Sequence, residues 1–424
     1  MKGLKLSLVI MAAALLTIGL SGMAYAFHSG GVADCGGCHS MHTPKGTTAL
    51  LIGTDYSSTC LSCHANAATG SYHIMTYPLP AAGAAPINYS PGGDFAWLAK
   101  TYSFTVRGTV TTENGQTHGH NVVAADFGLV ADTDFPSNSH GGTFPTAKLA
   151  CNSCHDPHGK YRRIGGDATY TINTTGAPII GSGSYNNSAV PTASQAVGSY
   201  RLLAGIGYTQ DAGGTAIPYP GVPVASAPSA YNQTEATNQV RVAYGTPSTA
   251  NTATWGKWCA TCHTAMHSSG NYVHPIDQAM SGAIKTNYQT YVSSGIMTGL
   301  NATSYLSLVP FMENTGDYTV LKGHASNNGG YLSGPSGNDN VACLSCHRAH
   351  ASGFGNMLRW EMEGEFITVA SGVTPIWPGT DNGAPVQLAR GKTAAETQAA
   401  YYQRPATLFG AYQRVLCNKC HAQD

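Results

Sequence analysis

The chain has 424 residues, of which only 10% are charged, and its 21 basic residues balance its 21 acidic ones. Long amphipathic helices need a charged face, so this composition predicts few of them. Its 51 glycines and 22 prolines instead favour turns and irregular connections. A loop-rich chain of this length needs something other than packed helices to fill its interior.

The first residues have the features of an export signal. Two lysines give a positive start, an apolar run spans residues 6–20, and residues 24–26 read Ala-Tyr-Ala, a small-residue cleavage pattern. We predict that residues 1–26 are removed. The alternative is an uncleaved anchor, but the run is shorter than the ~20 apolar residues that a spanning helix needs. No later stretch reaches that length, so no transmembrane span is expected.

Twelve cysteines fall into six Cys-x-x-Cys pairs, each followed at once by a histidine. This is the attachment signature of c-type haem, in which both sulfurs form thioethers to the porphyrin and the histidine binds iron. The predicted attachment residues are Cys35, Cys38, Cys60, Cys63, Cys151, Cys154, Cys259, Cys262, Cys343, Cys346, Cys417 and Cys420. The predicted proximal iron ligands are His39, His64, His155, His263, His347 and His421. We therefore expect six covalently bound haem c groups in one domain, residues 27–424.

Other uses of paired cysteines fit this pattern less well. Disulfides within six three-residue rings would join no distant parts of the chain. Zinc ribbons do not require histidine directly after every second cysteine. A thioredoxin-like site needs one pair in a βαβ setting. The expected fold is mostly irregular, with a few short helices and strands, built around a chain of six haems.

The expected charge argues against binding to nucleic acid. Removal of the signal takes away two lysines and no acid, which leaves two more acidic than basic residues. Each haem then adds two propionates, which its iron only partly offsets. An acidic particle repels a polyphosphate backbone, so we expect no nucleic-acid partner.

Eleven further histidines compete for the six positions on the second faces of the irons. This excess favours bis-histidine ligation over methionine, and with it low potentials. Four candidates follow a proximal histidine by three or four residues: His42, His158, His350 and His267. Such a residue cannot reach the far face of the same haem, so we expect it to ligate a neighbouring one.

The remaining candidates stand apart from the motifs. Five have small or apolar neighbours that suit burial against a porphyrin: His28, His73, His120, His274 and His324. With the four above they make nine candidates for six positions, so three are spare. His118 and His140 lie among polar residues and are expected to be solvated loop residues. Residues 159–260 hold no histidine and are expected to form an outer wrap of loops and short strands.

Three regular elements are predicted outside the motifs. Residues 95–110 carry aromatic and β-branched side chains at alternate positions (Tyr102, Phe104, Val106), which predicts a short strand there. Apolar residues from Ile276 to Val292 fit one helical face, which predicts a helix that ends near Gly295. Thr393 and Glu396 form a capping box that opens a short helix, which Pro405 stops.

Longer motifs extend beyond the haem signatures. They include Phe27-His-Ser-Gly-Gly-Val-Ala, His155-Asp-Pro-His-Gly-Lys-Tyr-Arg-Arg, Tyr318-Thr-Val-Leu-Lys-Gly-His-Ala, Cys343-Leu-Ser-Cys-His-Arg-Ala-His and Leu416-Cys-Asn-Lys-Cys-His. On these motifs the chain resembles the hexahaem outer-surface cytochromes of metal-reducing bacteria, the outer-membrane cytochrome S type. The resemblance covers essentially the whole of residues 27–424.

The resemblance implies a largely coil fold and a continuous chain of bis-histidine haems in alternating parallel and perpendicular pairs. It also implies subunits joined head to tail, with the histidine at the position of His42 ligating the haem held by His347 of the adjacent subunit. The expected function is electron transfer through an extracellular filament. Other cytochromes would be the donors, and metal oxides or similar extracellular compounds the acceptors.

Two other functions are alternatives for a chain with six such motifs. A soluble monomeric electron shuttle in the periplasm would need the same motifs and differ only in oligomeric state. A multihaem reductase would need an open iron position or an unusual proximal residue, whereas all six proximal residues are histidine. The chain is therefore expected to be an electron-transfer protein and not an enzyme.

Overall fold

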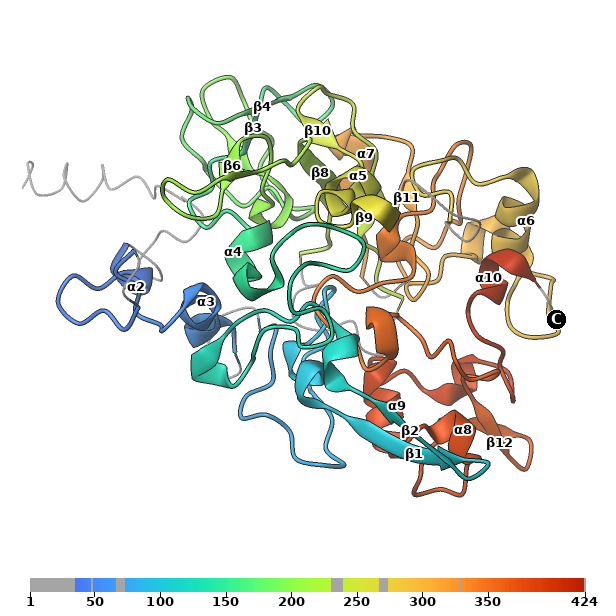
Figure 1. Ribbon diagram of the computed structural model, residues 1–424. Helices are drawn as coiled ribbons and strands as arrows, with labels where there is room; N and C mark the ends of the chain where they lie inside the picture. Colours follow the sequence, from blue (N-terminus) through green and yellow to red (C-terminus); the bar gives the residue numbers. More distant parts are fainter. Residues whose placement is uncertain are drawn as a thin grey trace, which may run out of the picture.

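Irregular segments make up most of the chain, as predicted, and connect short helices and strands (Figure 1). A computed structural model describes residues 35–46, 49–65, 73–229, 239–266, 274–327 and 329–422. The predicted signal, His28 and His267 lie outside the described residues. The longest α-helices described have nine residues and the longest strands five.

The described α-helices are short, and four of the nine consist of a single turn of four residues. They are α2 (Cys35–Cys38), α3 (Tyr56–His64), α4 (Cys151–Cys154), α5 (Trp255–Ala260), α6 (Gly282–Thr290), α7 (Tyr318–His324), α8 (Val386–Ala389), α9 (Ala394–Ala400) and α10 (Asn418–His421). At the start of α9, Thr393 Oγ1 accepts the N–H of Glu396 at 3.2 Å, and Glu396 Oε2 accepts the N–H of Thr393 at 3.0 Å. The predicted capping box is confirmed, and the helix ends before Pro405.

The predicted helix over residues 276–292 is wrong at its N-terminal end. Ser281 is the N-cap of α6 and its side chain accepts the N–H of Ile284 at 3.3 Å. Asp277 has a φ of 64°, which is incompatible with a right-handed helix. The apolar spacing before Ser281 therefore comes from an irregular segment, while the helix itself ends at Thr290.

In the part of the chain that the structure describes, the strands form five small sheets. The strands are β1 (Tyr102–Val106), β2 (Thr109–Glu113), β3 (Arg162–Ile164), β4 (Thr171–Asn173), β5 (Val197–Gly198), β6 (Tyr208–Thr209), β7 (Ala216–Ile217), β8 (Val222–Ser226), β9 (Ala243–Gly245), β10 (Thr252–Ala253), β11 (Met312–Glu313), β12 (Val369–Ser371) and β13 (Thr374–Ile376). The largest sheet has the order β10-β8-β9-β11, in which β10 and β11 pair in parallel with their neighbours and β8 and β9 are antiparallel.

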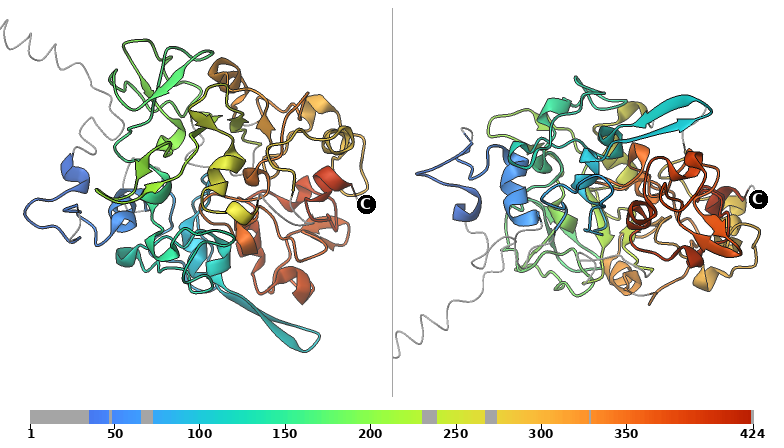
Figure 2. Two further views of the ribbon diagram at one scale, coloured as in Figure 1. Left: turned by 45° about the horizontal axis from the view of Figure 1, so that its top comes forward. Right: turned by 90° about the horizontal axis from the view of Figure 1, so that it is seen from below.

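The antiparallel hairpin β1–β2 projects from the body of the molecule (Figure 2). Its two-residue turn, Arg107-Gly108, has φ values of 52° and 81°, the left-handed pair that matches the twist of a hairpin. Tyr102 and Phe104 are buried while Ser103 and Thr105 are exposed, so the predicted alternation is confirmed. Glu113 at the base of β2 is buried.

The histidine-free stretch forms short strands, as predicted, but it also builds hydrophobic core. Its described residues contribute β3 to β10 and most of two buried clusters rich in tyrosine and tryptophan. A third, larger cluster joins early and late parts of the chain and includes Trp97, Phe354, Trp377 and Tyr401. The Trp377 and Tyr401 rings stack with centroids 4.2 Å apart.

A buried ion-pair network fixes the hairpin to the C-terminal part of the chain. Glu113 Oε1 accepts from Lys392 Nζ at 2.8 Å and pairs with His118 Nε2 at 2.9 Å, while Oε2 accepts from Arg390 Nη2 at 3.1 Å. Burial would raise the pKa of Glu113, but the His118 hydrogen bond and the Lys392 charge outweigh it and hold that pKa well below its ordinary value. Glu113 is therefore ionised in the folded protein.

Candidate functional site

Each Cys-x-x-Cys-His motif closes a short turn that brings its two sulfurs and its histidine together. Four motifs coincide with α2, α4 and α10 or with the end of α3. The fourth motif in the chain begins in the last turn of α5, and the fifth begins with a 3₁₀ turn at Cys343–Ser345. In five motifs the histidine N–H donates to the carbonyl of the first cysteine, at 2.8 to 3.2 Å. The turn leaves the cysteine side chains free of disulfides, as thioether formation requires.

The motifs follow one another in space in the order they have in the sequence. The Cys60 and Cys151 thiols hydrogen-bond to each other, as do those of Cys259 and Cys343. In the remaining pairs of neighbours, one sulfur lies close enough to add to the effect of burial in raising the pKa of the other: Cys63 acts on Cys38, Cys262 on Cys154, and Cys420 on Cys346. Groups attached to the six motifs would therefore form one continuous row.

Within the described residues, at least four proximal histidines face a second histidine ring. The pairs and the distances between their ring centres are His39–His158 at 6.4 Å, His120–His263 at 6.0 Å, His155–His350 at 6.3 Å and His274–His421 at 6.2 Å. Two metal–nitrogen bonds of about 2.0–2.1 Å and the size of the rings leave centres roughly 6 Å apart. These pairs therefore have the spacing needed to hold one iron between them.

Backbone carbonyls orient the proximal rings. Nδ1 lies 2.6 to 2.8 Å from a carbonyl oxygen in His39, His155, His263 and His347, and in His120 opposite His263. An Nδ1–H donated to a carbonyl leaves Nε2 as the lone-pair nitrogen and raises its basicity. Burial lowers the pKa of His120 to about 4 and that of His350 to about 3, which keeps both rings neutral, as a metal ligand must be.

Three further candidates, His42, His73 and His324, lie within the described residues. His42 is exposed, and within the described ranges no histidine ring lies opposite it or opposite His347. The peptide next to His73 is close to the second motif, because the Ile74 N–H donates to the His64 carbonyl at 2.9 Å. His324 Nδ1 pairs with Glu313 at 2.6 Å, and its ring stacks on Tyr331 at 4.1 Å.

The expectation that His118 is solvated is wrong. Its side chain is 0% exposed, with Nε2 at 2.9 Å from Glu113 and Nδ1 at 3.0 Å from the Trp97 carbonyl. Both ring nitrogens face oxygen acceptors, so neither can offer a lone pair to iron. His140 is exposed as expected, and its carbonyl accepts from His263. The sequence signal for His118 was the nearby acid, Glu113, on the preceding strand.

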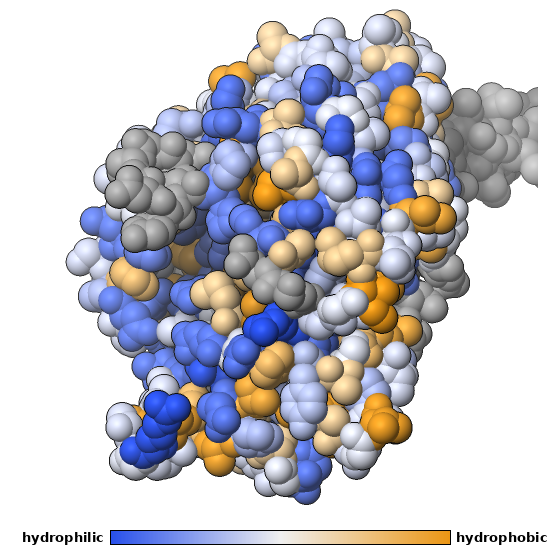
Figure 3. Space-filling view, turned by 90° about the vertical axis from the view of Figure 1, so that its right-hand side faces the viewer, coloured by the Kyte–Doolittle hydropathy of each residue, from blue (hydrophilic) through white to orange (hydrophobic). Residues whose placement is uncertain are grey.

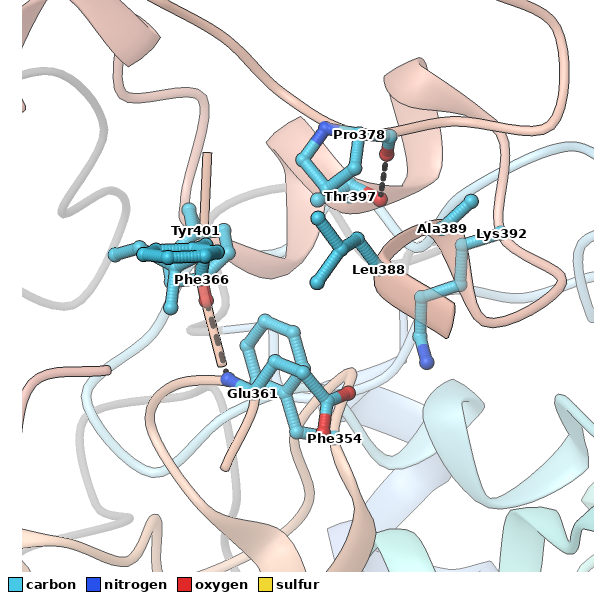
Figure 4. Close-up of a pocket in the computed structure, with 10 residues that line it drawn as sticks. Phe354, Glu361, Phe366, Pro378, Leu388, Ala389, Lys392, Thr397 and Tyr401 are labelled. Carbon is cyan, nitrogen blue, oxygen red and sulfur yellow. Dashed lines mark hydrogen bonds between the residues drawn. The ribbon is translucent and has the colours of Figure 1, made fainter. Parts of the chain in front are cut away.

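A small pocket beside the Glu113 network is not part of these sites (Figure 4). None of the described residues that line it is a cysteine or a histidine. The Tyr401 hydroxyl accepts the Glu361 N–H at 3.1 Å, and the Thr397 hydroxyl donates to the Pro378 carbonyl at 2.8 Å. These contacts hold the C-terminal segments together, and the pocket has a packing role.

Comparison with known proteins gives a whole-chain match. No family model matches the chain. It is 49% identical to the c-type cytochrome OmcS of Geobacter sulfurreducens, over 100% of both chains. Two cryo-EM structures of OmcS filaments, from the same organism, match with a TM-score of 0.83 at 46% and 47% identity, covering 94% of this chain and 100% of the other.

The six motifs, the facing histidine rings and the coil-rich fold define a multihaem c-type cytochrome, an electron-transfer protein and not an enzyme. The 49% identity to OmcS over the full length shows which family of these cytochromes the chain belongs to. The chain belongs to the OmcS family, and the resemblance drawn from its motifs is confirmed. No helix within the described ranges is long and apolar enough to cross a membrane.

Proposed function

We propose that this chain carries six bis-histidine haem c groups and assembles head to tail into an extracellular filament that conducts electrons over long distances. Each haem supplies an iron that takes up and releases one electron. The twelve motif cysteines hold the haems, and the six motif histidines bind the first face of each iron. The ring pairs at 6.0 to 6.4 Å are the observation that carries the proposal.

The second-face ligands follow from the same pairs. His158, His350, His120 and His274 serve the irons bound by His39, His155, His263 and His421, respectively. His324 is assigned as spare, because its ring lies against Tyr331 and faces no proximal histidine within the described residues. The iron of His64 takes one of His28, His73 and His267, and the other two are spare. These assignments use five of the nine candidate histidines. His42 is the sixth ligand, and its iron belongs to another subunit.

A regular step along the row supports a role for His42 between subunits. His158, in the third motif, faces His39 of the first, and His350, in the fifth, faces His155 of the third. Each of these histidines thus serves the haem two positions earlier. The same step from His42, in the first motif, leads to the fifth motif of a preceding subunit. That motif contains His347, which faces no ring within the described part of its own chain.

The two ends of the row lie at opposite ends of the molecule. Figures 1 and 2 show α2 and its loop projecting at one end and α10 at the other. Met41, beside His42, is 81% exposed. The α10 end carries the exposed apolar side chains Val292, Ile296 and Leu300, and Figure 3 shows apolar groups scattered among polar ones on this face. This arrangement suits a heterologous contact, which generates a filament when it does not close.

The remaining parts of the proposal concern location and partners. Residues 1–26 would direct export, and residues 27–424 would form a single domain on the outer surface. The OmcS structures are those of filaments, which supports this location over a periplasmic monomer. Electrons would enter from other cytochromes and leave to metal oxides or other extracellular acceptors.

The haem number is tested directly on the purified protein. We expect its mass to equal that of residues 27–424 plus six haems, because each motif attaches one group through two thioethers. A spectroscopic haem count per chain should give the same number. A mass with five haems, or with free thiols that react with an alkylating reagent, would contradict the assignment of all twelve cysteines.

The ligand assignment predicts opposite results for two histidines. His158→Ala should keep six haems but convert one of them to a high-spin, five-coordinate iron, seen in the visible and electron paramagnetic resonance spectra. His324→Ala is the matched control and should leave every haem low-spin, because the His324 ring lies against Tyr331 and faces no proximal histidine within the described residues. A high-spin signal from His324→Ala would refute the assignment.

A further inference from the structure

The third and fourth haem motifs are joined by an aromatic pair that belongs to neither haem. The ring of Tyr219, between β7 and β8, stacks on the indole of Trp258 with centroids 4.8 Å apart and planes 13° apart. Trp258 directly precedes Cys259 in the fourth motif. Tyr219 is only 4% exposed, and the pair is enclosed by the cluster of β8 and α7.

Both partners of the Trp258 indole are tied to the third motif. The Tyr219 hydroxyl donates to the Ser153 carbonyl at 2.7 Å and lies 4.0 Å from Cys154 Sγ. The indole N–H of Trp258 donates to the Ala204 carbonyl at 2.9 Å, and the Ala204 N–H donates to the Cys154 carbonyl at 2.9 Å. The indole is thus fixed by the stack on Tyr219 and by the hydrogen bond of its nitrogen. Both Tyr219 and Ala204 in turn hydrogen-bond to the backbone at Ser153 and Cys154.

This junction differs from those on either side of it. The second and third motifs touch through Cys60 and Cys151, and the fourth and fifth through Cys259 and Cys343, by direct contact between their thiols. Between Cys154 and Cys262 no such hydrogen bond is found among the described residues, and the Tyr219 hydroxyl lies beside Cys154 Sγ instead. The stacked rings therefore supply a connection that the sulfurs do not make.

We propose that Tyr219 and Trp258 form a clamp that sets the relative position of the third and fourth haems and hence the electronic coupling between them. Stacked rings have few accessible arrangements in a close-packed core, so the clamp restricts rotation of α5 against α4. Tyr219 and Trp258 are positioning residues that bind no iron. The inference rests on the haem attachment in the proposed function.

The test compares Tyr219→Phe, Tyr219→Leu and the control Tyr170→Leu in the exported, haem-loaded protein. Tyr170 is buried in the same cluster, but its ring neighbours are Tyr318 and Arg163, neither of which belongs to a haem motif. The measurements are the mass, which counts haems, and the circular dichroism of the Soret band. Neighbouring haems couple as excitons there, so the signal depends on their relative orientation.

Tyr219→Phe should reduce the Soret couplet in part, because the stack remains and the bond to Ser153 is lost. Tyr219→Leu should reduce it further, and Tyr170→Leu should leave it unchanged. Wild-type Soret signals in both Tyr219 variants, at six haems per chain, would overturn the clamp. If Tyr219→Leu loads fewer haems, Tyr219→Phe decides the question alone. If the mass of the wild-type protein showed fewer than six haems per chain, the haem assignment in the proposed function would be wrong.

Discussion

His42→Ala is expected to leave six haems attached and to abolish filaments. One of the six irons should become high-spin, because the vacant position is that of the haem bound by His347 and no described ring of the same chain faces it. Loss of more than ~1.4 kcal/mol from each contact between subunits raises the concentration needed for assembly by more than tenfold. Electron microscopy of the purified variant should show single particles.

Added imidazole separates ligation from assembly. It should restore the low-spin spectrum of His42→Ala by occupying the vacant position, yet it cannot connect two subunits, so filaments should remain absent. The control is His140→Ala, which removes another exposed histidine whose ring stacks on Phe135. That variant should form filaments with all haems low-spin. Filaments of normal length from His42→Ala would refute ligation between subunits.

The haem-binding motifs could be predicted from sequence because their chemistry is local. Two sulfurs and a histidine within five residues determine an attachment site whatever the rest of the chain does. The same holds for the Thr393–Glu396 capping box and for the alternation in β1, where partners are neighbours along the chain. In each case the interaction that defines the element lies within a few residues.

The second-face ligands could not be chosen from sequence because their partners are distant. His158 lies opposite His39, and His350 opposite His155, across more than a hundred residues. The burial of His118 could not be predicted for the same reason. Its polar neighbours in sequence indicated a solvated loop, whereas Glu113 and the Trp97 carbonyl hydrogen-bond to its buried ring. The helix over residues 276–292 failed because apolar spacing does not report the backbone turn at Asp277.

The Glu113 network gives the largest expected effect on stability. Glu113→Gln should lower the free energy of unfolding by about 3–5 kcal/mol, because it leaves Lys392 and Arg390 buried with an incomplete counter-charge. Glu363 provides the control, since it pairs with the same Arg390 but its side chain is 58% exposed. Glu363→Gln should cost about 1 kcal/mol or less. Denaturant titration followed by tryptophan fluorescence, which the haems quench in the folded state, measures both.

The pH dependence distinguishes a charge effect from a packing effect. The folded pKa of Glu113 is depressed, so its contribution is fully present well above the ordinary glutamate pKa of about 4.3 and is lost as the pH falls below it. The unfolded chain then binds a proton that the folded chain does not. The difference in stability between wild type and Glu113→Gln should therefore shrink as the pH falls from neutral toward 3. A difference that stays constant over this range would show that Glu113 acts through its shape alone.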